Sequence, residues 1–216
     1  DIGVTGVQTC ALPISVEGAL PASLSFARDV EPAAVAGLVQ RGLALVGSHA
    51  REVHVQRGVA AAFLTRFAAA AAALPMGDLR DPATMIGPII NARQRARIKA
   101  HVDDAVAKSA TLVCGGGWVG NRCEPTILTG VTRDMLCHGE ETFGPVTSVY
   151  IVDGLDAALQ AANDSRYGLS SAIFTADLGH AMRFAREVRA GMVHVRSEEH
   201  TSELQSRQYL VCRLLL

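Results

Sequence analysis

One short run of the sequence combines two carboxylates, an aromatic ring and a Gly-Pro turn. It reads His-Gly-Glu-Glu-Thr-Phe-Gly-Pro-Val over residues 138–146, and a largely apolar segment of strand type, residues 146–152, follows directly. Loops that adjoin buried strands commonly build ligand sites in α/β folds. We therefore predict a ligand-binding loop here. The alternative is that Phe143 anchors the core while Glu140 and Glu141 are solvated.

The cysteines and a glycine triplet predict no second site. Cys114, Cys123 and Cys137 match no zinc-ligand spacing and lack an accompanying histidine pair, so we interpret them as small buried or loop residues and predict no metal site. The glycines at residues 115–117 follow a strand, but without GxGxxG spacing or a following helix they indicate a plain loop. The chain has 5 cysteines and no CxxC pair, which favours reduced thiols in a cytoplasmic compartment.

The histidines are scattered along the chain. His54 lies in a predicted strand, His101 on a predicted polar helix face and His138 beside a loop. None has a serine or cysteine partner that the sequence makes evident, so the chain alone predicts no catalytic dyad.

Hydrophobic periodicity predicts strands that alternate with helices. Helices are expected at residues 31–46, 59–73, 91–109, 155–163 and 178–188, and strands at residues 51–56, 111–114, 125–128, 146–152, 171–175 and 192–195. Asn91 should cap the third helix, which should bury a stripe of Ile98, Val102, Ala105 and Val106. This alternation predicts an α/β fold with an open, mainly parallel sheet and flanking helices.

Composition narrows the classes of partner. The chain has 216 residues, 49% of them apolar, and 20 Lys+Arg against 21 Asp+Glu give a formal net charge of -1. Such a chain builds one globular domain or two small ones, and its near-neutral charge argues against nucleic-acid or anionic-membrane binding. No apolar run reaches the ~20 residues of a membrane helix, and no secretory signal is visible after Asp1.

Neither end of the chain shows helical or strand periodicity. Back-translated, residues 4–14 can be written as a common sequencing-library adapter, and residues 196–206 as the same adapter on the opposite strand. We therefore expect residues 1–15 and 196–216 to be translated adapter and residues 16–195 to be the native segment.

A series of motifs resembles one enzyme family in order and spacing. The motifs are GD at 77–78, DP at 81–82, IGPIIN at 86–91, EPTIL at 124–128, EETFGPV at 140–146, ANDSRYGL at 162–169 and GMVHV at 191–195. Residues 16–195 are thereby similar to NAD(P)-dependent aldehyde dehydrogenases. The resemblance implies an incomplete catalytic domain built on an open α/β sheet, with the coenzyme-binding domain almost wholly upstream.

The resemblance also implies a mechanism. A cysteine thiolate attacks the aldehyde, a hydride passes to the nicotinamide, and a glutamate base activates the water that hydrolyses the thioester. The family's GQxC motif falls on residues 47–50 and puts Ala50 at the cysteine, and a methyl group forms no thiohemiacetal. The link from Ala50 to Val55 is also shorter than in the family. The general-base motif, ELGG, falls near Glu17, which is the general-base candidate.

The cofactor contacts implied by the resemblance are present. Glu141 matches the glutamate that holds the nicotinamide ribose hydroxyls, and Phe143 matches the ring packed against the nicotinamide. The parent protein would use NAD or NADP and a small-molecule aldehyde, and would form a homo-oligomer. Because the coenzyme-binding domain is missing, we do not expect this chain alone to bind the cofactor.

Two functions are compatible with this pattern. In the first, the parent is an NAD(P)-dependent aldehyde oxidoreductase, and Ala50 with its short loop is a sequence error or a variant. In the second, the parent is a catalytically dead member of the family, such as one domain of a duplicated protein, and serves scaffolding or assembly. In both, this chain is expected to have no dehydrogenase activity.

Overall fold

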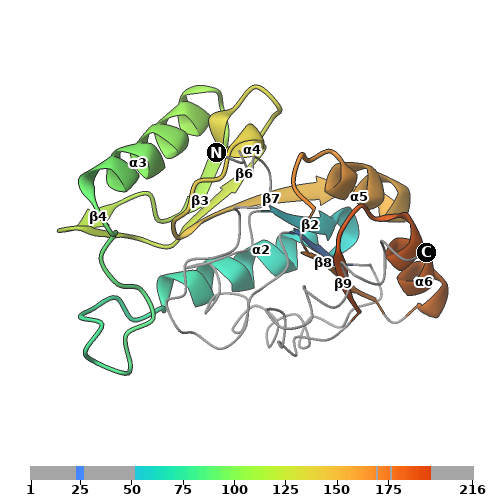
Figure 1. The fold of residues 1–216 in the computed structure, drawn as a ribbon, viewed down its shortest axis with the longest axis horizontal. Helices are drawn as coiled ribbons and strands as arrows, with labels where there is room; N and C mark the ends of the chain where they lie inside the picture. Colours follow the sequence, from blue (N-terminus) through green and yellow to red (C-terminus); the bar gives the residue numbers. More distant parts are fainter. Residues whose placement is uncertain (1–22, 27–51, 169, 176, 196–216) are drawn as a thin grey trace, which may run out of the picture.

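The computed structural model describes residues 23–26, 52–168, 170–175 and 177–195. They build a seven-stranded sheet in the order β3-β6-β7-β2-β1-β8-β9 (Figure 1). Its strands are β1 (Ser23–Phe26), β2 (Glu52–Gln56), β3 (Thr111–Cys114), β6 (Thr126–Thr129), β7 (Val146–Val152), β8 (Ser170–Phe174) and β9 (Met192–Val195). Every neighbouring pair is parallel except β3 and β6 at one edge. The predicted open, mainly parallel α/β sheet is confirmed.

Helices cover both faces of this sheet. They are α2 (Arg57–Ala72), α3 (Ala92–Ala107), α4 (Leu136–Gly139), α5 (Gly154–Asn163) and α6 (Leu178–Glu187). Figure 1 shows α2 on one side of the sheet and α3 with α4 on the other. Alternate strand residues face the two layers, because successive side chains of a strand point in opposite directions. Ile127 therefore packs in the α2 cluster, and its neighbour Leu128 packs in the α3 cluster.

The first two described helices begin at side-chain caps. The Gln56 side chain accepts a hydrogen bond from the Gly58 amide at 2.8 Å at the start of α2. At the start of α3, the Asn91 side chain accepts one from the Gln94 amide, also at 2.8 Å, which confirms the predicted cap. The capped amides would otherwise lack partners in the first helical turn.

The buried stripe of α3 differs from the predicted one. Ile98, Val102 and Ala105 are buried, but Val106 is 46% exposed and His101 is only 2% exposed. The prediction that His101 lies on a polar face is therefore wrong. His101 stands three residues after Ile98 and four before Ala105, which places it on the same helical face.

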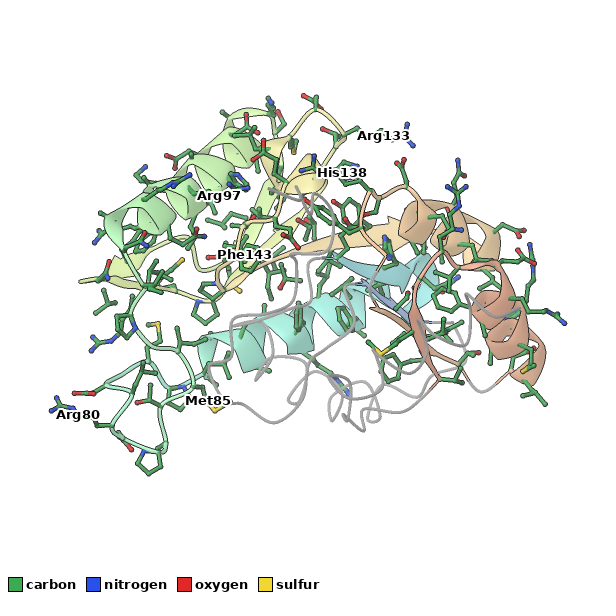
Figure 2. All side chains as sticks on the ribbon, in the orientation of Figure 1. Arg80, Met85, Arg97, Arg133, His138 and Phe143 are labelled. Carbon is green, nitrogen blue, oxygen red and sulfur yellow. The ribbon has the colours of Figure 1, made fainter. Side chains whose placement is uncertain are left out.

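A short hairpin and a one-turn helix were missed by the sequence analysis. The hairpin is β4 (Trp118–Val119) with β5 (Arg122–Cys123), and the helix is α4. Arg122 donates to the Gly77 carbonyl at 2.9 Å and Asn121 to the Ile89 carbonyl at 2.6 Å. The hairpin thus holds the base of the segment that projects beyond α2, where Figure 2 labels Arg80 and Met85.

The glycine triplet before this hairpin is a loop, as predicted. The Gly116 amide donates to Thr126 Oγ1 at 2.9 Å and the Gly117 amide donates to the Glu124 carboxylate at 3.1 Å. Because side chains of the chain already occupy these two amides, the loop is not a phosphate cradle.

One prediction stays untested, and one bears on membrane insertion. The helix expected at residues 31–46 lies outside the described residues. Within the described ranges, no helix is long and apolar enough to cross a membrane.

Candidate functional site

The loop of residues 140–145 connects α4 to the first residue of β7. It therefore lies at the amino end of β7, and not at the carboxyl end, where open parallel sheets usually bind ligands. The neighbouring strand β2 enters the sheet at the same edge, because Glu52 pairs with Ser148 in parallel register. In the sequence, Glu52 comes two residues after Ala50. The 140–145 loop therefore precedes β7 at the same edge at which β2 begins, two residues after Ala50 in the sequence.

Phe143 has an unusual backbone in this loop. Its φ angle is +49°, in the left-handed region that bulky residues rarely occupy, and its side chain is 44% exposed. The alternative that Phe143 anchors the core is wrong. A strained backbone that presents an aromatic ring to solvent is typical of functional sites.

Side chains of α3 hold the loop from one side (Figure 2). Gln94 Nε2 donates to the Thr142 carbonyl at 2.6 Å and to the Phe143 carbonyl at 2.8 Å. Arg97 donates to the Glu141 carbonyl at 2.9 Å and to the Glu140 carboxylate at 3.1 Å. The loop carbonyls on both sides of the left-handed residue are therefore bonded to one rigid helix.

His101 adds a buried contact to the same loop. Its Nδ1 lies 3.0 Å from Thr142 Oγ1, and its Nε2 lies 3.7 Å from the Glu140 carboxylate. Burial and, after it, the charge of Arg97 lower the pKa of His101, although Glu140 and Asp104 oppose that shift. The neutral ring is thus favoured in the folded chain.

Gly144 stands at a point of the loop where a side chain would meet a neighbouring residue. A Cβ atom at Gly144 would lie 2.5 Å from Cδ1 of the fully buried Ile98. The next residue, Pro145, accepts a hydrogen bond from the Thr126 amide at 2.7 Å. The Gly-Pro turn therefore fits the loop closely between α3 and the first residues of β6 and β7.

Comparisons with known proteins agree with the motifs of this loop. The model of the aldehyde dehydrogenase family matches residues 28–207. The chain belongs to the aldehyde dehydrogenase family. It is 44% identical over 151 residues to vanillin dehydrogenase of Pseudomonas fluorescens, a match that covers 70% of this chain and 31% of that protein. This aldehyde dehydrogenase chain therefore spans about a third of the length of that relative.

Solved aldehyde dehydrogenase structures share the fold. A P. syringae indole-3-acetaldehyde dehydrogenase, a cysteine-to-alanine mutant in complex with NAD+ and IAA, is 32% identical with a TM-score of 0.75, over 85% of this chain and 39% of that one. An NADP-dependent glyceraldehyde-3-phosphate dehydrogenase from Bacillus halodurans, complexed with NADP, is 28% identical with a TM-score of 0.77, over 85% of this chain and 39% of that one. Catalytic domains of this family are open α/β sheets like the one described above.

The residues assigned from the family resemblance divide into two groups. Glu141 and Phe143 lie two residues apart in the 140–145 loop, where Glu141 is partly buried and Phe143 is exposed. Ala50 and Glu17 lie outside the described residues. Of the residues assigned from the resemblance, the structure therefore describes the geometry of Glu141 and Phe143.

Two of the remaining cysteines are poor replacements for the nucleophile of an aldehyde dehydrogenase. Burial raises the pKa of the Cys123 thiol to about 11, and burial also raises the pKa of Cys114. A nucleophilic cysteine needs the opposite shift, because the thiolate is the attacking species. Within the described ranges, no group of three or more His, Cys, Asp and Glu side chains could hold a metal ion.

The structure also brings together two histidines that are far apart in the sequence. His138 Nδ1 lies 3.0 Å from the Tyr150 hydroxyl, and the ring of His54 stacks on Tyr150 at 5.4 Å between centroids. The Glu52 carboxylate lies 3.7 Å from His54 Nε2. The sequence analysis missed this polar row, in which Glu52 and His54 are buried and His138 and Tyr150 are partly buried, because His54 meets Tyr150 through the pairing of β2 with β7.

Proposed function

We propose that this chain is a segment of an NAD(P)-dependent aldehyde oxidoreductase, and that its 140–145 loop binds the nicotinamide end of the cofactor. The observation that carries the proposal is the exposed Phe143 ring, held in a left-handed backbone by side chains of α3. A core residue would not need this strain, whereas a ring that receives a flat ligand benefits from a fixed position.

The residues of the loop suit such a ligand. The Phe143 ring offers an apolar face to the nicotinamide, and the Glu141 carboxylate accepts hydrogen bonds from the ribose hydroxyls. The Arg97 bond to the Glu141 carbonyl fixes the backbone from which that carboxylate extends. When bound, the cofactor supplies the hydride acceptor for oxidation of a small-molecule aldehyde.

We infer that the chain itself is inactive because Ala50 replaces the nucleophile. The relative with a cysteine-to-alanine substitution is described as a complex with NAD+, which supports a loss of chemistry rather than a loss of the family's cofactor contacts. Glu17 stays the proposed general base. The purified 216-residue chain should produce no NADH or NADPH above background from any aldehyde, and measurable turnover would overturn this inference.

A chimera tests the cofactor role of the loop. In this chimera, residues 52–195 of this chain replace the aligned segment of the P. fluorescens vanillin dehydrogenase. The rest of the chimera keeps the sequence of the vanillin dehydrogenase. We expect vanillin-dependent NADH formation. Glu141→Gln and Phe143→Ala should each raise the KM for NAD by roughly tenfold, the factor expected for one charged hydrogen bond or one ring contact.

The control for this chimera is Leu178→Ala, because Leu178 on α6 is 74% exposed and lies outside the loop. It should leave the KM for NAD unchanged. A folded chimera whose KM for NAD does not respond to either loop substitution would refute the assignment of the loop.

A second candidate function is scaffolding or assembly by a catalytically dead member of the family. It is favoured by the combination of Ala50, the shortened link to Val55 and the sequence Glu-Gly-Ala-Leu at residues 17–20, which departs from the ELGG of the family. The coding sequence upstream discriminates the two. An intact ELGG and GQxC copy upstream supports a duplicated protein, and a cysteine codon at position 50 on resequencing supports an ordinary enzyme.

We further propose that the native protein is cytoplasmic and forms a homo-oligomer, without a membrane or nucleic-acid partner. We also propose that residues 1–15 and 196–216 come from adapter DNA. Adapter-free reads of the source DNA that still encode residues 1–15 would overturn the adapter proposal.

A further inference from the structure

We propose that His101 is a positioning residue of the 140–145 loop: its buried ring bonds Thr142 and thereby keeps Phe143 in the orientation that receives the cofactor. The inference rests on the proposed cofactor role of that loop. The ring is only 2% exposed, and its two nitrogens face Thr142 Oγ1 and the Glu140 carboxylate.

Packing alone does not explain a histidine at this position. Its neighbours in the stripe, Ile98, Val102 and Ala105, are all apolar, so a leucine would complete the buried surface of α3. A buried polar ring is unfavourable unless its nitrogens find partners. Both polar partners of His101 belong to residues of one loop, Glu140 and Thr142.

The tautomer of the ring fits this arrangement. The nearby Glu140 carboxylate favours a hydrogen on Nε2, so Nδ1 accepts the hydrogen of the Thr142 hydroxyl. Thr142 is then held at two points, since its carbonyl accepts from Gln94. Phe143 follows directly, and its backbone cannot leave the left-handed region without moving the bonded Thr142.

Cleavage by chymotrypsin after Phe143 reports this restraint in the full 216-residue chain. A protease requires an extended substrate, so cleavage requires the loop to open locally. His101→Leu and Thr142→Val, which keep bulk but lose the bond, should each speed cleavage about fivefold, the factor of one net hydrogen bond. His101→Asn retains an amide near the place of Nδ1 and should restore a rate close to that of the parent chain.

Phe184→Leu provides the control for general destabilisation. Phe184 is fully buried in the separate cluster of α5, α6 and β8, so the substitution lowers global stability without touching the loop. If Phe184→Leu speeds cleavage after Phe143 as much as His101→Leu at matched stability, His101 has only a structural role and the proposal is wrong. Equal rates of cleavage after Phe143 in His101→Leu and His101→Asn would also contradict the proposal.

The chimera separates this proposal from the proposed function. There, His101→Leu should raise the KM for NAD several-fold with little change in kcat, and His101→Asn should reverse the rise. If the KM for NAD rises in Glu141→Gln but not in His101→Leu, the positioning role of His101 is wrong and the proposed cofactor site still holds. A KM that responds to neither refutes the cofactor site, whereas the cleavage assay still shows whether His101 restrains the loop.

Discussion

At the scale of single residues, the site depends on polar side chains through which a helix holds a loop, and of these His101 is buried. Gln94, Arg97 and His101 recur along α3 at spacings of three and four, so all three project from one helical face. Their partners are four consecutive residues, 140–143. Because side chains of one helical face bond to successive residues of the loop, Phe143 is kept in a left-handed backbone conformation that its own side chain disfavours.

His101 gives the folded chain a distinct pH dependence. Its pKa is lowered in the folded state, whereas the unfolded chain takes up a proton near pH 6.5. The contribution of the neutral ring is therefore complete above about pH 6.5 and is lost as the pH falls through the window below that value. In urea titrations, His101→Asn should show a shallower loss of unfolding free energy in this window. If the unfolding free energy of the parent chain and of His101→Asn falls equally steeply with pH in this window, His101 is not the group responsible.

Gly144 and Ile98 should be energetically coupled. Gly144→Ala brings a methyl group against the Ile98 side chain and should cost about 1–3 kcal/mol of unfolding free energy. Ile98→Val alone should cost about 1 kcal/mol, because it removes one buried methyl group. The double variant should lose less than the sum, since the removed Cδ1 is the atom that clashes. If the losses of unfolding free energy are additive in a double-mutant cycle, Gly144 and Ile98 are not in close contact.

At the scale of elements, segments with a clear hydrophobic pattern were predictable, whereas the β4–β5 hairpin and the one-turn helix α4 were not. β7 and β9 have the predicted bounds, and α2, α3, α5 and α6 differ by one or two residues at their ends. The β4–β5 hairpin has strands of two residues, and α4 has four residues, so each contains about one period and shows no repeat of the pattern. The burial of His101 was missed because a histidine was assumed to be polar, although its spacing fits the apolar stripe.

The candidate site was only partly predictable for a related reason. Glu141 and Phe143 came from the motif, but their α3 partners lie more than 40 residues away in the sequence. No local period encodes such a contact. The left-handed φ of Phe143 was equally hidden, because glycine is the residue that usually marks this region.

The glycine loop before the hairpin offers a matched pair of variants. Gly115 and Gly120 both have positive φ angles, +75° and +61°, but a Cβ at Gly115 would lie 2.1 Å from the Pro125 carbonyl oxygen, and one at Gly120 meets open space. Gly120→Ala should cost about 1 kcal/mol from backbone strain alone. Gly115→Ala should cost more than about 3 kcal/mol, because backbone must also move. Equal losses in chemical denaturation would argue against the close contact with Pro125.

At the scale of the whole molecule, we propose that the chain joins a cofactor-binding loop to a segment that lacks the nucleophile. The loop precedes the first residue of β7, and β2, which follows Ala50 in the sequence, is the parallel neighbour of β7. The matched segment covers 31% of the vanillin dehydrogenase, so that relative is about three times longer than the segment. We propose that the loss of chemistry lies in the segment around Ala50 and not in the 140–145 loop.

A pair of chimeras tests that attribution most directly. One carries residues 52–195 of this chain in vanillin dehydrogenase, and the other carries residues 31–195, which adds Ala50 and its shortened loop. Vanillin-dependent NADH formation is measured in both, after each is shown to fold. The account predicts turnover in the first chimera and none in the second. Turnover in the second, or a folded first chimera without turnover, would contradict it.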